Sequence, residues 1–448
     1  MLLQTVFQEA EEAYRKRTER SREAHAAAQK VMPGGDTRTI AFFKPYPLTV
    51  SRGSGPRIYD ADGCEYLDFL NNYTAMIHGH AHPFILEKVQ AAITLGTGYA
   101  AAIAEQRELA EILCGRIPGM DQVRFCNSGT EATMFALRAA RAYTGRPAVI
   151  KMEGGYHGTH DAVEFSIAPG AERDSRQPGW TPIPDTKGVP ESVARDVYVA
   201  PFNDPAAVEE ILRQKGEEVA AILVEPVMGV AGVIPPLPGY LAELRRLADQ
   251  YGVLLVFDEV QTLRLDLGGA QRKFGVTPDL TAIGKIIGGG FPVGAFGGRA
   301  EIMAQFDPNQ SGCLSQSGTF NGNRATMAAG IASMTLLDER AIARLDLLGE
   351  RLEAGMRAAI GRYAVPASVN RIGSMLNLHF TERPPVDYAS THSPYKELSK
   401  LVHLELLNRG VFTAPRGMWN LSTVMEETDI DQAVDAFADV MAKVSRHL

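Results

Sequence analysis

Cysteine is scarce in this sequence, and the few that occur lie far apart. The four are Cys64, Cys114, Cys126 and Cys313, and none forms a C-x-x-C pair. This spacing argues against a zinc site or a disulfide scaffold and is typical of a protein from a reducing cytoplasm. Long apolar runs are also missing. None approaches the roughly 18 residues of a membrane span, and the charged start, residues 1–22, is unlike a signal peptide.

Basic charge is lacking as well. The chain has 45 Lys and Arg residues against 53 Asp and Glu residues, so no large basic field is available to recruit nucleic-acid phosphates. Two nucleotide-binding motifs are absent, because no G-x-G-x-x-G follows the first strand of the α/β region and no G-x-x-x-x-G-K-[ST] occurs. What the chain does have is 448 residues, too many for one core, so we expect two or three lobes.

The order of patterns along the chain predicts three domains. Residues 1–70 form an N-terminal segment with an amphipathic helix over 4–31 and a small antiparallel sheet. Further on, buried strands alternate with helices, which indicates a parallel α/β sheet, and we assign 71–335 to one large domain. Residues 336–448 then form a C-terminal α/β lobe.

Two loops need an interpretation. His78, His80 and His82 are close in sequence, but no helix carries them and no carboxylate lies among them. Loop and capping roles are therefore favoured over a metal site, and we expect no metal. Residues 168–193 are polar and rich in Pro, Gly and Arg. A loop this long inside a compact domain is usually functional or mobile, and it would suit a lid.

A strand predicted at 122–126 runs into a helix through small residues. Ser128, Gly129 and Thr130 lie at the start of that helix. Backbone N–H groups at a helix N-terminus bind phosphate, and the two hydroxyl groups would add further donors. The alternative is a plain N-cap by Ser128 or Thr130.

Three further strands end in residues that suit an aromatic ligand. Tyr156 and His157 follow a strand between glycines, and either could stack on a flat ring or plug the core. Glu225 and Asp258 each follow a buried strand. A carboxylate in the place of Asp258 can keep a pyridine nitrogen protonated, and its alternatives are a helix N-cap and a salt bridge.

Lys285 follows an apolar run, residues 281–284, and precedes three glycines, residues 288–290. Most lysines at strand ends are solvated, but these surroundings favour a buried amine. Burial favours the neutral amine, which forms a Schiff base with an aldehyde. A phosphate nest, a ring-stacking side chain, a strand-end aspartate and this lysine together fit pyridoxal 5'-phosphate (PLP).

The same segments resemble the class III (ω-type) aminotransferases of PLP fold type I. The matching motifs are N-S-G-T-E-A at 127–132, G-Y-H-G at 155–158, E-P at 225–226, D-E-V-Q-T at 258–262 and G-K-I-I-G-G-G at 284–290. The likeness is nearest to the branch that holds glutamate-1-semialdehyde aminomutase and the β-phenylalanine aminotransferases. It implies a large domain with a mainly parallel seven-stranded sheet flanked by helices, a smaller α/β lobe built from both termini, and a homodimer with shared active sites.

The resemblance also implies roles at the cofactor. Lys285 would be the Schiff-base lysine and proton shuttle, and Asp258 would pair with the pyridinium; these two are the expected catalytic residues. The other expected cofactor contacts are Ser128, Gly129 and Thr130 at the phosphate, Thr319 reaching it from the other subunit, Tyr156 and Val260 on the two ring faces, Gln261 near the ring hydroxyl, and Glu225.

Substrate residues follow from the same resemblance. Arg38 falls where the branch has an arginine for a substrate carboxylate, although a solvated loop arginine is the ordinary alternative. Arg416 lies in an Arg-Gly loop like that of the β-phenylalanine aminotransferases, and Tyr73 resembles a pocket tyrosine of that branch. One departure concerns Arg264. Its segment, 262–265, is one residue shorter than the Thr-Gly-Phe-Arg stretch of the branch, which leaves its role open.

These points favour a cytoplasmic aminotransferase that moves an amino group from a β-amino acid or related amine to a keto acid such as 2-oxoglutarate or pyruvate. The mechanism would be ping-pong, through the aldimine and pyridoxamine forms of the cofactor. Three alternatives stay open: glutamate-1-semialdehyde 2,1-aminomutase, a broad-specificity ω-transaminase, and an inactive homologue that serves as a binding protein. Arg416 and Trp419 weigh against the aminomutase, and the intact Lys285 and Asp258 weigh against an inactive homologue.

Overall fold

The computed structural model describes residues 2–170 and 182–447, and the chain divides into two compact units. Unit 1 consists of Met1–His82, Arg344–Pro384 and Ser393–Leu448, so it draws on both ends of the chain. Unit 2 consists of Pro83–Ala343 and Pro385–His392. Of the loop predicted at 168–193, the part from 171 to 181 lies outside the described residues.

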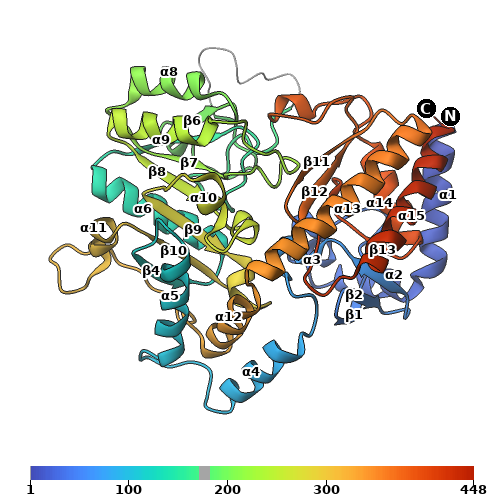
Figure 1. The fold of residues 1–448 in the computed structure, drawn as a ribbon, viewed down its shortest axis with the longest axis horizontal. Coiled ribbons are helices and arrows are strands. Elements are labelled where there is room, and N and C mark those ends of the chain that lie inside the picture. The colour runs from blue at the N-terminus through green and yellow to red at the C-terminus, as the bar shows by residue number, and fades with distance from the viewer. Residues whose placement is uncertain (1, 171–181, 448) are drawn as a thin grey trace. The chain divides into compact units, whose positions relative to one another are not determined.

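A seven-stranded sheet forms the middle of unit 2 (Figure 1). Its strands, in order across the sheet, are β4 (Gln122–Cys126), β10 (Gly294–Gly298), β9 (Leu280–Gly284), β8 (Leu254–Asp258), β7 (Val219–Val224), β5 (Ala148–Met152) and β6 (Val197–Ala200). Strand β10 runs antiparallel to both of its neighbours, and the other pairs are parallel. The mainly parallel seven-stranded sheet predicted from the sequence is therefore confirmed.

Alternate residues of the central strands enter two different apolar cores. Ala221 and Leu223 of β7 pack in the core that contains α6 (Gly129–Thr144). Ile222 and Val224 pack in the core that contains α8 (Pro205–Lys215) and α9 (Tyr240–Tyr251). Because helices cover both faces, β7 is a continuous apolar run in sequence rather than an alternating one. This double burial fixes the strands, and with them the loops at their carboxyl ends.

The other helices of unit 2 are shorter or lie near the edges of the sheet. They are α4 (Pro83–Ile93), α5 (Ala104–Arg116), α7 (Glu191–Ala194), α10 (Gly269–Phe274), α11 (Ala300–Met303) and α12 (Arg324–Leu336), with 3-10 turns η3 (Thr262–Leu265), η4 (Lys285–Gly288), η5 (Ala304–Phe306) and η6 (Ala389–Thr391). Helix α12 packs against η4, where the Ser333 hydroxyl donates to the Ile286 carbonyl at 2.7 Å. This contact supports the turn that begins at Lys285.

Unit 1 contains two small sheets. One has the order β1 (Val50–Ser54), β2 (Arg57–Asp60), β3 (Glu65–Asp68), β13 (Val411–Phe412), and the other has the order β11 (Ser368–Ile372), β12 (Met375–His379), β14 (Met418–Asn420). Strands β1 to β3 are antiparallel, as the sequence predicts, and β13 joins them in parallel. The helical elements are α1 (Leu2–Arg17), α2 (Glu19–Ala28), η1 (Pro33–Gly35), η2 (Thr39–Ala41), α3 (Asn71–Thr74), α14 (Leu398–Asn408) and α15 (Glu427–Ser445), and α13 (Glu339–Tyr363) begins at the end of unit 2 and continues into unit 1.

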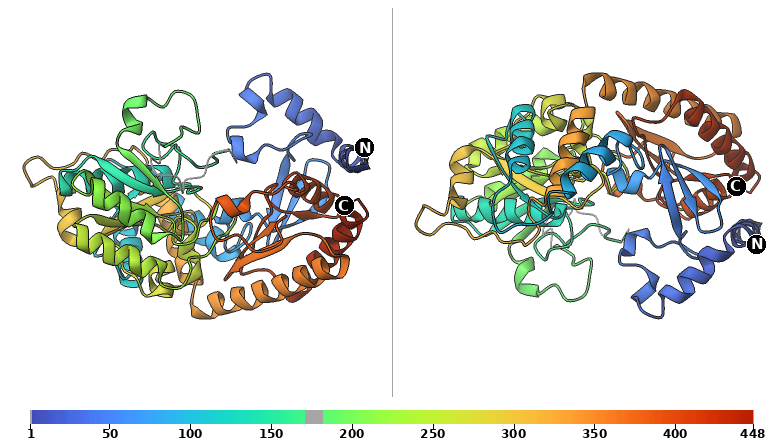
Figure 2. Two further views of the ribbon diagram at one scale, coloured as in Figure 1. Left: turned by 90° about the horizontal axis from the view of Figure 1, so that it is seen from above. Right: turned by 90° about the horizontal axis from the view of Figure 1, so that it is seen from below.

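The first and last helices of the chain meet within unit 1. Helix α14 packs against both α1 and α15, and Figures 1 and 2 show α1 in blue near α15 in dark red. The Nζ atom of Lys443 in α15 lies 3.5 Å from a carboxylate oxygen of Glu9 in α1. Among residues 2–170 and 182–447, no helix is both long and apolar enough to cross a membrane.

The single helix predicted over residues 4–31 is wrong, because two helices occupy this segment. Helix α1 ends at Arg17, and Thr18 leaves the helical conformation with φ −127° and ψ 46°. The buried Thr18 hydroxyl donates to the Tyr14 carbonyl at 2.7 Å and lies 3.0 Å from the Tyr46 hydroxyl. These bonds satisfy a polar group that burial would otherwise penalise. The amphipathic pattern could not reveal the break, because Tyr46 is distant in sequence.

Candidate active site

The turn between β4 and α6 carries the three residues predicted to hold phosphate. Ser128 is the N-cap of α6, and its Oγ accepts a hydrogen bond from the Glu131 backbone N–H at 3.1 Å. The capping alternative is therefore correct for Ser128. Gly129 and Thr130 are the first helical residues, and N–H groups at these positions have no acceptor within the helix. A cap and an anion site can coexist here, since they use different donors.

Three strand ends converge on this turn. A Cβ added at Gly129 would lie 3.1 Å from Cγ1 of Val260, and one added at Gly284 would lie 3.5 Å from the same atom. The loops that follow β4, β8 and β9 therefore meet at Val260. Lys285 is the residue after Gly284, so the chain brings the predicted lysine and the predicted phosphate loop into one neighbourhood. The two glycines permit this close approach because neither carries a side chain.

Lys285 lies at the junction of β9 and η4. Its φ is 52°, in the left-handed region that residues with a Cβ seldom adopt. The residues of β9 are buried, whereas Lys285 itself is only partly buried. The buried amine expected from the sequence is corrected here to a partly buried residue, because the buried strand ends before Lys285. A partly exposed amine stays accessible to a small molecule.

Asp258 ends β8 and is buried. Its Oδ2 lies 2.9 Å from Nδ1 of His157, and its Oδ1 accepts from the Val260 backbone N–H at 3.0 Å. Burial lowers the pKa of His157 and outweighs the opposing bond to Asp258, so the imidazole is neutral near pH 7 and donates through Nδ1. The two bonds hold the carboxylate in place. Since His157 is buried and bonded in this way, Tyr156 is the better candidate for stacking on a ring.

Glu225 holds the loop that carries Tyr156. Its Oε1 accepts from the Tyr156 backbone N–H at 2.9 Å, and its Oε2 accepts from the Gly229 N–H at 3.0 Å. The pKa of Glu225 is raised to about 8, first by burial and then by the charge of Asp258, while the two N–H donors and Lys285 oppose the shift. Asp258 and Lys285 therefore both lie close enough to act on this carboxyl group.

A second lysine, which the sequence did not single out, lies behind the same loop. Lys151 is completely buried in β5, and its Nζ donates to the Gly155 carbonyl at 3.0 Å and to the Phe165 carbonyl. Burial lowers the pKa of Lys151 to about 8, against nearby acidic groups that include Asp185 and Glu225. The only sequence signal was a lysine inside an otherwise apolar strand. Its role is to satisfy carbonyl groups beside Tyr156.

The segment after Asp258 consists mostly of buried residues that pack or form hydrogen bonds within the protein. Gln261 is buried and lies against Gly229. A Cβ added at Gly229 would lie 2.5 Å from Oε1 of Gln261. Glu259 is fully buried and accepts hydrogen bonds from the backbone N–H groups of Ala270 and Gln271. Arg264 lies in η3 and is also buried, and desolvation lowers its pKa to about 9. Arg264, whose role the sequence left open, is therefore a core residue.

The loop before α12 lies against the β4–α6 turn. The Asn127 side chain donates to Oδ1 of Asn321 at 2.7 Å, and Nε2 of Gln316 donates to the Phe125 carbonyl at 2.9 Å. Thr319, between these two anchors, is exposed. The loop is thus fixed to its own chain while Thr319 faces solvent.

The three predicted substrate residues come together in unit 1. Nη1 of Arg38 donates to Oδ1 of Asn72 at 2.7 Å, and the guanidinium carbon of Arg416 lies 5.4 Å from the centre of the Tyr73 ring. The Tyr73 hydroxyl donates to the Ile40 carbonyl at 2.6 Å. Burial raises the pKa of Tyr73, and Arg416 and Arg38 both oppose this shift. Both guanidinium groups therefore lie within electrostatic range of one phenol.

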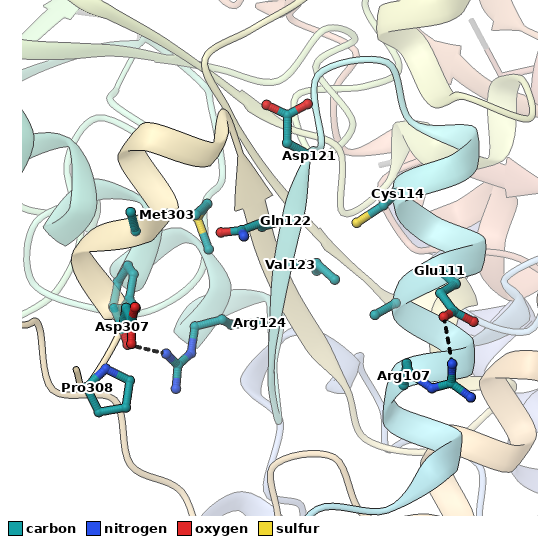
Figure 3. Close-up of a pocket in the computed structure, with 13 residues that line it drawn as sticks. Arg107, Glu111, Cys114, Asp121, Gln122, Val123, Arg124, Met303, Asp307 and Pro308 are labelled. Carbon is teal, nitrogen blue, oxygen red and sulfur yellow. Dashed lines mark hydrogen bonds and ion pairs between the residues drawn. The ribbon is translucent and has the colours of Figure 1, made fainter. Parts of the chain in front are cut away.

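A separate hollow of about 560 Å³ lies beside β4 (Figure 3). Helix α5 and the segment from α11 to residue 308 form its walls. Both of its arginines have partners within the chain: Arg107 lies 3.2 Å from Glu111, and Arg124 donates to the Phe306 carbonyl at 2.7 Å. Among the described residues that line it, none is a predicted site residue. The hollow is therefore distinct from the candidate site.

One family model, that of class III aminotransferases, matches residues 42–441. A curated relative from Bacillus subtilis (strain 168), named glutamate-1-semialdehyde 2,1-aminomutase, is 40% identical over 435 residues, which cover 96% of this chain and 99% of the relative. Nearly all of the chain is thus similar in sequence to proteins of this family.

Three solved structures agree in fold. An omega-transaminase from Sphaerobacter thermophilus has a TM-score of 0.91 at 43% identity and covers 95% of this chain and 98% of its own. A transaminase described with PLP bound has a TM-score of 0.87 at 37% identity, and the match covers 96% of this chain and 99% of the transaminase. A β-phenylalanine aminotransferase from Variovorax paradoxus has a TM-score of 0.88 at 38% identity, and the match covers 97% of this chain and 96% of the aminotransferase. With the family match, the seven-stranded sheet and the convergent strand ends, this chain belongs to the class III aminotransferase family.

Proposed function

We propose that this protein is a PLP-dependent aminotransferase that moves an amino group from a β-amino acid or a related amine to a keto acid such as 2-oxoglutarate or pyruvate. The observation that carries the proposal is that Arg38 and Arg416 both lie within electrostatic range of Tyr73. A donor and an acceptor that share one site present their carboxylates in more than one pose. Two guanidinium groups can bind both, because each offers a planar fork of donors to a carboxylate.

The residues of unit 2 fit PLP by their chemistry. The first turn of α6 offers N–H groups to a phosphate, and Gly129 and Gly284 leave the backbone there uncovered. Asp258 offers a carboxylate that neutral His157 orients, and Lys285 offers a partly exposed amine. In this proposal Ser128, Gly129 and Thr130 hold the phosphate, Tyr156 and Val260 flank the ring, Gln261 lies near the ring hydroxyl, Glu225 holds the Tyr156 loop, and Thr319 comes from the other subunit.

When bound, PLP supplies an aldehyde that takes up amino groups and a ring that accepts the electron pair of a substrate C–H bond. Nζ of Lys285 takes the proton from the substrate carbon and returns a proton at the end of the half-reaction. Asp258 stabilises a proton on the ring nitrogen, and its bonds to His157 and to the Val260 N–H keep its oxygens from rotating away. Because His157 is neutral, it orients Asp258 without cancelling its charge.

The proposal includes a homodimer with shared active sites, which an exposed apolar surface supports. Leu95 and Phe320 are each 66% exposed, and Tyr99 is exposed as well. Their segments are held together, since Arg324 donates to the Leu95 carbonyl at 3.1 Å and Asn323 donates to a carbonyl two residues further on. Large exposed apolar side chains gathered in this way are typical of protein interfaces. Thr319 precedes Phe320, so a second copy covering this surface would meet it.

A two-step assay on the holoenzyme tests the transfer. The enzyme is first treated with a β-amino acid and freed of excess donor, and then a keto acid is added. The expected result is loss of the cofactor's visible absorbance in the first step and formation of a new amino acid in the second. If the donor-treated enzyme passes its amino group to no keto acid, the proposal fails.

A second candidate is glutamate-1-semialdehyde 2,1-aminomutase, because the curated relative at 40% identity carries that name. An aminomutase rearranges one substrate and needs no separate acceptor. Product formed from glutamate 1-semialdehyde in the absence of any keto acid would favour it over the aminotransferase. A third reading, a broad-specificity ω-transaminase, predicts comparable rates with amines that lack a carboxylate, so a donor screen separates it from the leading proposal.

A further inference from the structure

Four consecutive residues of unit 1 have left-handed backbone conformations. The φ angles are 49° for Asn71, 48° for Asn72, 54° for Tyr73 and 78° for Thr74. None of the four is glycine. Single Asn residues tolerate this region, but a run that includes Tyr and Thr is seldom adopted and persists only where the surroundings hold it. The contacts of this turn therefore indicate what it positions.

The turn is fixed at its base. Oδ1 of Asp68 accepts the backbone N–H groups of Leu70 and Asn71, both at 2.8 Å. The Asn71 side chain donates to the Asn420 carbonyl at 2.7 Å. Asn420 belongs to β14, the strand that directly follows the loop of Arg416. The turn is thus attached to the element that carries one of the two substrate arginines.

The two middle residues of the turn contact both arginines. Asn72 accepts from the Arg38 guanidinium at 2.7 Å, and the next residue, Tyr73, places its ring 5.4 Å from the guanidinium carbon of Arg416. The Tyr73 hydroxyl also bonds the Ile40 carbonyl, two residues after Arg38. Arg38 is therefore held at two points, by a side chain and through its own loop.

The partner of the Arg38 guanidinium is a neutral amide. An amide oxygen orients a guanidinium without neutralising it, whereas a carboxylate would form an ion pair with it and neutralise its charge. Asp36 is close in sequence, but its Oδ1 accepts the backbone N–H groups of Thr37 at 2.6 Å and of Arg38 at 3.1 Å. The Asp36 carboxylate thus bonds backbone N–H groups of its own loop.

We infer that Asn72 is a positioning residue that sets the specificity for carboxylate-bearing substrates: it holds the Arg38 guanidinium by a neutral hydrogen bond, so that the positive charge stays available to the substrate carboxylate. The inference rests on the proposed function, in which Arg38 binds that carboxylate. An acid at position 72 would pair with Arg38 in the free enzyme, and the substrate would have to compete with that pair. A residue without an acceptor would leave the Arg38 side chain to be ordered when substrate binds.

Three variants and a control test this inference. Asn72→Asp keeps the shape and adds a charge. Asn72→Gly removes the amide and keeps the left-handed turn, since glycine adopts it freely. Arg38→Ala removes the proposed carboxylate partner. The matched control is Gln250→Glu, because the Gln250 oxygen also accepts from an arginine, Arg246, but on the exposed face of α9.

The measurements are kcat and KM of each holoenzyme for a β-amino acid and for an amine donor without a carboxylate, and the inhibition constant of benzoate. Asn72→Asp is expected to raise KM for the β-amino acid and the benzoate constant about tenfold, with kcat within about twofold, because charged hydrogen bonds differ from neutral ones by about that factor. Asn72→Gly should give a smaller rise. The amine constants and the Gln250→Glu control should not change.

The double variant of Arg38→Ala with Asn72→Asp gives the sharpest outcome. With Arg38 absent, the Asn72→Asp effect should shrink to within about twofold, because the coupling between contacting residues is gone. A full tenfold effect in that background, or an equal rise for the amine donor, overturns the inference. If Arg38→Ala leaves the β-amino acid KM and the benzoate constant unchanged, the proposed carboxylate role of Arg38 fails instead. If Arg38→Ala raises them and Asn72→Asp does not, the role of Asn72 alone fails.

Discussion

Nδ1 of His157 lies 2.9 Å from Oδ2 of Asp258, and both side chains are buried in unit 2. Asp258 ends β8 and His157 lies in the loop after β5; both strands end at the same edge of the sheet, and the loop after β5 brings His157 to Asp258. The imidazole is neutral because burial lowers its pKa, and it therefore supplies a hydrogen bond without a positive charge. Of the two donors to this carboxylate, the imidazole is a side chain and can be replaced, whereas the Val260 N–H belongs to the backbone.

His157→Phe removes this donor and keeps a ring of similar size. We expect kcat/KM to fall about 10- to 100-fold, the usual cost of losing a hydrogen bond to a charged group. The cofactor should also leave more readily on dialysis, as measured by its visible absorbance. His157→Asn can still donate to Asp258 and should recover most of both quantities. Equal behaviour of the Phe variant and the wild type would refute the role of this bond.

Lys285→Ala should lower kcat at least about a thousandfold, because the proton-transferring amine is lost. The control is Lys273→Ala, since Lys273 is an exposed lysine of α10 with no proposed role. Turnover at saturating donor is the measurement, and the melting temperature checks that each variant is folded. A folded Lys285→Ala enzyme with more than a tenth of wild-type kcat would show that another group moves the proton.

Glu225→Gln should change how stability depends on pH. Burial raises the pKa of Glu225 to about 8 from 4.5, so between these values the folded state binds more protons than the unfolded state. The contribution of Glu225 to stability is therefore present at low pH and declines as pH rises through this window, by at most about 1.4 kcal/mol per pH unit. We expect the melting temperature of the wild type, relative to Glu225→Gln, to fall from pH 4.5 to 8. Thermal unfolding of the holoenzymes at a series of pH values measures it.

The control for this experiment is Glu217→Gln, at an exposed position. It should leave the pH dependence of the melting temperature as it is in the wild type. A difference between wild type and Glu225→Gln that stays constant over the window would mean that Glu225 is ionised in the folded state throughout.

Leu95→Glu should weaken the proposed homodimer. Leu95 and Leu347 are both 66% exposed, but Leu95 belongs to the exposed apolar surface, since Arg324 bonds both the Leu95 carbonyl and the Tyr99 hydroxyl. A charge placed in an interface core is costly to desolvate, so the Leu95 variant should shift toward the monomer and lose activity at low protein concentration. Leu347→Glu should change neither quantity. Light scattering after size-exclusion chromatography measures the mass, and an unchanged dimer with Leu95→Glu would place the interface elsewhere.

The strands of unit 2 could be predicted closely from the sequence. The strands predicted before Tyr156 and Glu225 are present as β5 and β7, because each is a short apolar run that ends at residues with a different character. Local pattern is sufficient where a strand is buried on both faces. It was not sufficient for the N-terminal helix, where a hydroxyl contact between Thr18 and Tyr46 interrupts the amphipathic period.

Individual residues of the candidate site were predicted more readily than their partners. Lys285 and Asp258 could be singled out because each follows an apolar run where a charged side chain is unexpected. Lys151 was missed because a single lysine in a strand does not indicate that its amine donates to two carbonyl groups. The left-handed turn at Asn71–Thr74 was missed because its residues have no glycine to mark it.

By itself, the sequence determined that the chain would end buried strands in a small-residue turn, an aspartate and a lysine, since these depend only on neighbouring residues. Only the tertiary structure decided that His157 orients Asp258, that Glu225 holds the Tyr156 loop, and that one strained turn contacts both Arg38 and Arg416. Each of these contacts joins segments that are distant along the chain. Such contacts form because the packing of strands and helices brings them into register, which no local pattern encodes.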